Sequence, residues 1–240
     1  MGMLESTSAL LSRTQGGDMP YPVDPEVQAY SEAKDAALSK VLKHEGGYQN
    51  NKSDAANKNS KGQWVGTNKG ITPQAYEEYT GEVPTQRDMM KLSKDKASAI
   101  YTANYVRPIV DNLGIKPTSP LFEQVLDMAV NHGYSGAVAI IQRAAGTEVD
   151  GKAGPATAQA IAALPPEELN NRMVDARQAE YARINKAKPE TATFSKGWNK
   201  RAESFRRDNG ESKPESAPVA GESPEPAGAV QGYSSRPQMR

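Results

Sequence analysis

The stretch LSKVLKHEGGY, residues 38–48, predicts the last turns of an amphipathic helix and the point at which that helix stops. Leu38, Val41 and Leu42 recur at spacings of three and four residues, so they share one helical face. The paired glycines that follow end the helix, because glycine weakens helices and favours turns. Similar patterns fill most of the chain, which indicates a mainly α fold.

The first helix is expected to begin with Asp24 as its cap and Pro25 at its first position, and to end at Glu45. Only residues 63–72 look like strand material, in a small β-hairpin. The other expected helices run from Pro73 to Tyr79, from Ser93 to Tyr105, from Pro120 to Gly133, from Ser135 to Ala145, from Pro155 to Leu164 and from about Pro166 to Lys186, followed by a basic helix around Trp198.

Two end segments lack the apolar residues of a core. Residues 1–23 are polar, and residues 209–240 are rich in Pro, Glu, Ser, Gly and Ala, so both are expected to be flexible tails. The chain has 240 residues, of which 37% are hydrophobic, so it can bury one core of moderate domain size.

Composition and charge exclude several classes of function. Lys and Arg total 29, as do Asp and Glu, so no bulk charge favours nucleic acid or a membrane surface. No apolar run reaches the roughly 18 residues of a membrane span, and residues 1–17 lack the pattern of a signal peptide, so synthesis in the cytoplasm is expected. The chain has no cysteine, and His44 has no second histidine four residues later, so neither a metal nor a cofactor is expected.

Glu45 is the first candidate for chemistry. It follows Val41 by four residues and Leu38 by seven, which continues the apolar stripe and predicts partial burial. Burial and the negative end of the helix dipole both disfavour a carboxylate, so the pKa of Glu45 is expected to be raised, as a general acid requires. A glutamate in a last helical turn is more often a solvated structural residue, so its neighbours decide between the two roles.

Those neighbours are typical of a sugar-binding cleft. Asp54, in the following polar loop, offers a second carboxylate, and Trp64 offers an aromatic wall near the turn Gly70-Ile71-Thr72. Tyr48 is expected to wall the space that the paired glycines leave open. One acid, one carboxylate and an aromatic wall together indicate a glycosidase.

These motifs resemble glycoside hydrolase family 108, the phage and secretion-effector N-acetylmuramidases. The family pattern opens Glu-Gly-Gly-Tyr and continues through an Asp to a Gly-Ile-Thr turn, which here correspond to residues 45–48, Asp54 and residues 70–72. One departure is that Asp54 is followed by Ala55-Ala56-Asn57, where the family usually has Gly-Gly. The resemblance covers roughly residues 36–206 and includes Ile100-Tyr101, Asn104-Tyr105, Asp127, Asn131, Gly133, Gln142, Asp150-Gly151, Gly154-Pro155, Thr157, Arg177 and Gly197-Trp198.

The resemblance implies a lysozyme-like helical fold, with residues 24–118 as the muramidase catalytic region and residues 119–208 as a helical peptidoglycan-binding region packed on it. It implies that Glu45 is the proton donor and that the partner is bacterial peptidoglycan, cleaved between N-acetylmuramic acid and N-acetylglucosamine. Asp54 is the second catalytic candidate, either as the distant base of an inverting enzyme or as the closer nucleophile of a retaining one. The residues expected to bind substrate are Tyr48, Trp64, Thr72, Tyr105 and Asn131.

Two other functions fit the same residues. A lytic transglycosylase needs only one acid/base glutamate, because the muramic 6-hydroxyl attacks internally. A structural virion protein or a peptidoglycan-binding protein would keep the fold while its chemistry became weak.

The tails suggest where the protein acts. Residues 1–40 carry six acidic and three basic side chains, and they cannot fold alone. The hypothesis is that residues 1–35 and 209–240 attach the enzyme to other virion proteins in a phage particle, which uses it to penetrate the cell wall. A free endolysin whose tails are unselected linkers is the alternative.

Overall fold

The structure is a computed structural model that describes residues 24–44 and 46–207. The tails expected at residues 1–23 and 209–240 lie outside the described residues, and so does the candidate acid Glu45.

Helix α2 (Pro25–His44) begins as the sequence predicts. The backbone N–H of Glu26 donates to Asp24 Oδ1 at 2.8 Å, and proline at the first helical position lacks an N–H that would have no intrahelical partner there. In the second half of the helix Leu38 and Val41 are buried, and α2 packs against α7 (Phe122–Ala145). The apolar stripe that leads toward Glu45 is therefore covered by protein.

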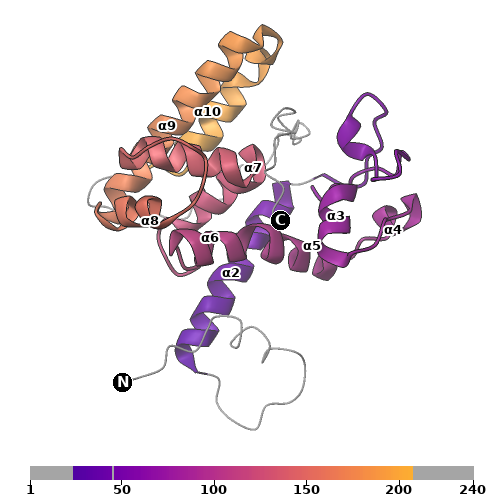
Figure 1. Cartoon of the computed structure of the whole chain (residues 1–240), viewed down its shortest axis with the longest axis horizontal. Helices are drawn as coiled ribbons and strands as arrows, with labels where there is room; N and C mark the ends of the chain where they lie inside the picture. Colours follow the sequence, from indigo (N-terminus) through magenta and orange to yellow (C-terminus); the bar gives the residue numbers. More distant parts are fainter. Residues whose placement is uncertain (1–23, 45, 208–240) are drawn as a thin grey trace, which may run out of the picture.

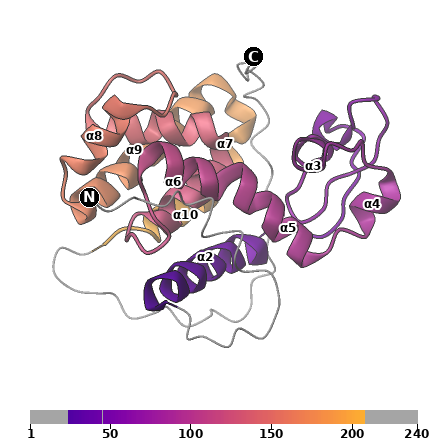
Figure 2. The same ribbon diagram turned by 60° about the horizontal axis from the view of Figure 1, so that its bottom comes forward.

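Residues 46–93 form a small lobe beside the helices (Figures 1 and 2). The lobe contains η1 (Ala55–Asn57), α3 (Pro73–Thr80) and α4 (Gln86–Met90). Helix α3 begins at the Thr72 cap and ends at Gly81 in left-handed conformation, as predicted. The expected hairpin is reduced to three isolated antiparallel bridges, which join Gln49 to Thr67, Lys58 to Trp64 and Asn68 to Ile71.

Helix α5 (Lys94–Tyr101) leads out of the lobe toward the helical body (Figure 2). Ser93 caps it as predicted, but the helix does not end at Tyr105. The chain continues through the π-helix η2 (Thr102–Val106) into α6 (Arg107–Leu113). Pro108 lies in the first turn of α6, where a proline is tolerated, so it does not stop the helix.

Helix α7 is the centre of the helical body. Gly133, with φ 72° and ψ 160°, breaks its helical geometry, so the predicted stop at this glycine is present as a kink between two helical segments. Around α7 are packed α8 (Pro155–Ala162), α9 (Pro166–Ala187) and η2, and α9 in turn contacts η3 (Pro189–Phe194) and α10 (Ser195–Glu203).

The predicted fold class is confirmed: the protein is mainly helical and consistent with a lysozyme-like fold. In the described part of the chain, no helix has both the length and the apolar character needed to cross a membrane.

Candidate active site

The loop that follows α2 is organised around one buried asparagine. The amide of Asn57 exchanges two 3.1 Å hydrogen bonds with the amide of Gln49, and its Nδ2 also donates to Asn51 O at 2.9 Å. Its Oδ1 accepts from Thr67 Oγ1 at 2.6 Å, and its own carbonyl accepts from two backbone N–H groups of the returning chain at 3.0 Å. Because buried polar groups are costly unless satisfied, this network fixes the shape of the loop. The sequence marked Asn57 only as part of the departure that follows Asp54 and did not predict this structural role.

Asp54 caps η1 within this loop. Its Oδ1 accepts from the backbone N–H of Ala56 at 2.9 Å, and the side chain is half-buried. The loop-capping role is therefore present in the structure, and it holds the carboxylate in a fixed orientation. A catalytic role for Asp54 remains a prediction.

Tyr48 packs beside the same loop and against the core. Its hydroxyl donates to Val65 O at 3.2 Å. Gly66 makes this contact possible: a Cβ there would lie 2.6 Å from Tyr48 Cε2 and 2.6 Å from Gln49 O, and its φ is +84°. The chain thus needs glycine at position 66 to bring Tyr48 against the returning segment.

Trp64 lies opposite Lys58 in one of the isolated bridges, and its ring is half-buried. The Lys58 ammonium is 4.6 Å from the ring centroid, a cation–π contact on one face of the indole. Asn50 Nδ2 donates to the Trp64 carbonyl at 3.3 Å. Tyr48, Asp54 and Trp64 therefore all belong to the hydrogen-bonded loop that follows α2.

The other predicted substrate-binding residues lie on three separate elements. Thr72 Oγ1 accepts from Ala75 N–H as the cap of α3, and Asn131 Nδ2 donates to Asp127 O at 2.6 Å within α7. Tyr105 is part of η2, which contacts both α3 and α7. π-Helical turns occur often at functional sites, so the position of Tyr105 fits its predicted role. Thr72 and Asn131 also have clear structural tasks.

The paired glycines after α2 border open space. No described atom lies within 4 Å of the position that a Cβ would take at Gly46 or Gly47. This fits the predicted approach path for a ligand beside Glu45, which itself lies outside the described residues.

A buried ion network joins α7 to α9 and α10. Asp127 Oδ2 is 2.6 Å from Arg177 Nη2, and its Oδ1 accepts from Arg201 Nη2 at 2.6 Å. Burial by itself would raise the pKa of Asp127, but the two guanidinium groups outweigh burial and hold that pKa below its ordinary value. Arg177 is fully buried, and its Nε donates to Tyr181 Oη at 2.8 Å. The sequence showed Asp127 and Arg177 as motif positions but did not pair them.

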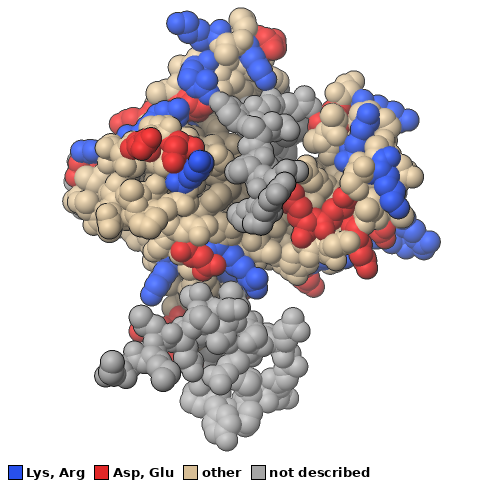
Figure 3. All heavy atoms as spheres, in the orientation of Figure 1, with Lys and Arg blue, Asp and Glu red and all other residues tan. Residues whose placement is uncertain are grey.

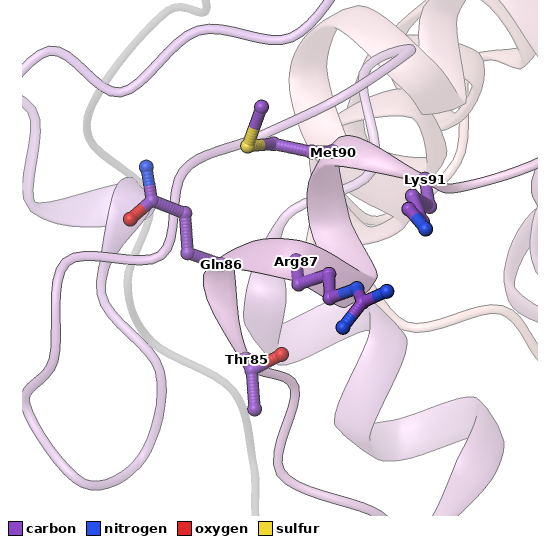
Figure 4. Close-up of a pocket in the computed structure, with 5 residues that line it drawn as sticks. All are labelled: Thr85, Gln86, Arg87, Met90 and Lys91. Carbon is purple, nitrogen blue, oxygen red and sulfur yellow. The ribbon is translucent and has the colours of Figure 1, made fainter.

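A surface pocket of about 560 Å³ lies over α4, and none of the predicted site residues lines it (Figure 4). Its side chains do not converge: Gln86 and Met90 extend from one side of the helix, and Arg87 and Lys91 from the other. Thr85 is engaged in capping α4. This pocket therefore offers no set of groups for catalysis.

Charge is unevenly distributed over the small lobe. Figure 3 shows acidic side chains gathered over α3 and α5, whereas lysine and arginine side chains occupy the outer edge of the lobe. Among residues 24–44 and 46–207, no group of His, Asp and Glu side chains is arranged to hold a metal ion.

Comparison with protein families relates this geometry to known proteins. Residues 38–133 match the family model described as glycosyl hydrolase 108, and residues 136–203 match the one described as "Predicted Peptidoglycan domain". The two matches divide beside the kink at Gly133. A solved structure titled "Structure of Brucella abortus SagA" is 28% identical with a TM-score of 0.56, and the match covers 75% of this chain and 98% of that one. Comparison with curated proteins gave no match.

Proposed function

Because the chain belongs to the glycosyl hydrolase 108 family and carries a peptidoglycan domain, we propose that this peptidoglycan hydrolase cleaves the bond between N-acetylmuramic acid and N-acetylglucosamine, with Glu45 as the general acid. The junction of α2 with the small lobe carries the proposal. Leu38 and Val41 on the buried face of α2 precede Glu45 by seven and four residues in the sequence, and the loop after the paired glycines holds Asp54, Tyr48 and Trp64.

The proposed reaction starts with proton transfer from Glu45 to the glycosidic oxygen, which leaves as the sugar alcohol while positive charge develops on the muramic ring. The fixed carboxylate of Asp54 either stabilises this charge or directs the attacking water. Water supplies the new hydroxyl at the anomeric carbon, and its second proton restores the acid.

The test is digestion of purified peptidoglycan by wild type and Glu45→Gln side by side. The glutamine keeps the shape but cannot donate the proton, so turnover is expected to fall by at least about 10²-fold. The melting temperature is expected to stay the same or rise, because functional carboxyl groups are seldom optimal for stability. Near-normal turnover by Glu45→Gln, in a folded protein, contradicts the mechanism.

Mass spectrometry of the products separates the proposed hydrolase from a lytic transglycosylase. Hydrolysis gives a reducing muramic acid end, whereas internal attack by the 6-hydroxyl gives a product lighter by one water. Binding to cell walls without release of fragments would instead indicate a binding protein with weak chemistry.

For location, we propose that the enzyme is made in the host cytoplasm and carried in a phage particle, tethered by its terminal segments. The polar N-terminal segment, residues 1–23, and the Pro/Glu/Ser-rich tail support this proposal by composition. The attachment segment was expected to span residues 1–35, but residues 25–35 form the first turns of α2. The deletion to test is therefore residues 1–23. Purified particles should contain the full chain and lose the truncated one, and equal packaging of both would exclude tethering by the arm.

A further inference from the structure

A cavity of about 550 Å³ lies where α2, α7 and α10 meet. Ala37, Lys40 and Val41 line it from α2, and Asp127 lines it from α7. The third wall, from α10, falls in the region matched by the peptidoglycan domain, whereas Lys40, Val41 and Asp127 of the other two walls fall in the region matched by glycosyl hydrolase 108. The volume is that of a ligand pocket, and the cavity joins the two functional regions.

The cavity walls carry charges of both signs. At the rim, Lys40 Nζ donates to Glu123 Oε1 at 2.8 Å, and inside, Asp127 pairs with Arg201 at 2.6 Å. Lys200 adds a third cation, and in the described part of the chain it has no ion-pair partner. The lining therefore has one more cation than carboxylates, which favours a ligand that is negative overall but also carries a positive group.

Gly197 lines the same cavity from within α10. Glycine weakens a helix relative to alanine, so a glycine inside one usually has a packing or backbone reason. Neither applies here: a Cβ at Gly197 would meet no described atom within 4 Å, and its φ is not positive. Gly197 therefore leaves open space beside the cavity that it lines.

We propose that this cavity binds the peptide stem of peptidoglycan, a short peptide with several carboxylates and, in its free form, one side-chain amine. Its carboxylates would meet Lys200 and Arg201, and its amine would meet Glu123. The stem hangs from muramic acid, and Val41 in the cavity wall precedes the proposed acid Glu45 by only four residues in the sequence. The inference rests on the proposed function, because it assigns the substrate group next to the sugar that is cut.

The first test fills the cavity. Gly197→Leu places an isobutyl group in the open space, and Gly197→Ala is the matched control that removes the glycine but adds only a methyl. Calorimetry with the soluble probe N-acetylmuramyl-L-Ala-D-Glu-meso-diaminopimelate should show at least about tenfold weaker binding for the leucine variant than for the alanine variant. Both should melt at or above the wild-type temperature, because both residues favour helix more than glycine does.

The second test changes charge. Lys200→Glu reverses the cation in the cavity, and Lys196→Glu reverses an exposed lysine of the same helix that does not line it. The first variant should bind the muramyl tripeptide at least about tenfold more weakly, and the second should bind it like wild type. Equal losses in both would show general charge attraction and would overturn the proposal.

Activity separates this inference from the proposed function. On intact peptidoglycan Gly197→Leu should have a raised KM, whereas on glycan strands stripped of stems by an amidase it should match Gly197→Ala.

If wild type digests both substrates but binds the tripeptide no better than Gly197→Leu does, the stem site is wrong and the hydrolase stands. If wild type binds the tripeptide in the cavity but digests neither substrate, the proposed function fails and the site stands. If the leucine substitution weakens binding of a chitin oligosaccharide but not of the tripeptide, the cavity binds glycan and the proposal is wrong.

Discussion

Asp54 has a visible structural task and a predicted chemical one, and two substitutions separate them. An asparagine at this position would still cap η1, since asparagine and aspartate are equally good caps, but it would lack the charge. Asp54→Asn is therefore expected to lower turnover at least about tenfold with little change in stability. Asp54→Ala should lose the same activity and also about 0.5–2 kcal/mol of stability. Full turnover by Asp54→Asn would leave the residue with its capping role alone.

Gly66 is the second residue whose replacement is informative. An alanine Cβ there would press on Tyr48 and the Gln49 carbonyl, and the left-handed φ adds strain. Gly66→Ala is expected to lose about 1–3 kcal/mol in urea unfolding. Gly62→Ala is the control, since Gly62 also has a positive φ of +74° but open space around its Cβ. Similar losses for the two variants would mean that backbone strain, and not the contact with Tyr48, sets the cost.

At the level of elements, sequence patterns predicted the helices that are bounded by local signals. Three helices begin at predicted caps, whose side chains accept hydrogen bonds from backbone N–H groups of the first turn: α2 at Asp24, α3 at Thr72 and α5 at Ser93. Gly81 ends α3, also as predicted. Helix α4 was missed although its signal is present: Thr85 and Asp88 form a capping box, in which each side chain accepts from the backbone N–H of the other. A five-residue helix is too short to show a periodic apolar face.

The remaining differences depend on tertiary structure. The π-helix η2 changes helical register within an otherwise ordinary sequence, so no local pattern marks it. The hairpin is replaced by single bridges because backbone groups of its first half bond elsewhere: Val65 N–H and Gly66 N–H donate to the Asn57 carbonyl, and Thr67 pairs with Gln49. In the site, the motif around Glu45 and Asp54 was readable from sequence, whereas the cavity between α2, α7 and α10 joins residues too distant in the chain to be paired from one sequence.

The ion network of α7, α9 and α10 gives an element-scale prediction. Arg177→Met removes the fully buried guanidinium and leaves the Asp127 carboxylate with Arg201 as its described ion partner. Loss of one member of a buried ion pair typically costs about 3–5 kcal/mol, so chemical unfolding should show a loss of this size. The double variant Arg177→Met with Asp127→Asn should recover part of it. Additive losses in this double-mutant cycle would show that the two residues do not stabilise each other.

At the scale of the whole molecule, the two matched regions share one core. Buried side chains of the small lobe, α2 and α7 belong to the same apolar cluster as those of α8 and α9. Asp127 adds an electrostatic link across the division between the two matches. The described part of the chain is therefore expected to unfold in one transition, and this makes the stability of the whole protein sensitive to single buried groups at the seam.

His132 is such a group. It lies largely buried in α7, its ring centroid is 5.2 Å from that of Tyr181, and its Nε2 has no hydrogen-bond partner among the described residues. Burial, and next the charge of Arg177, lower the pKa of His132 from 6.5 to about 4, against the opposite pull of Glu180 and Asp127.

The direction of the pH effect follows from this shift. Between pH 6.5 and about 4 the unfolded chain binds a proton at His132 that the folded protein excludes, so stability must fall as the pH is lowered through this window. His132→Phe keeps a ring against Tyr181 but cannot take up the proton. The variant is expected to be less sensitive to acid and to exceed wild type by up to about 3 kcal/mol near pH 4, relative to their difference at pH 8. Other carboxylates titrate in both proteins, so the measured quantity is the difference between the two unfolding curves at each pH. A difference that stays constant from pH 8 to pH 4 would show that His132 is protonated as readily in the folded protein as in the unfolded chain.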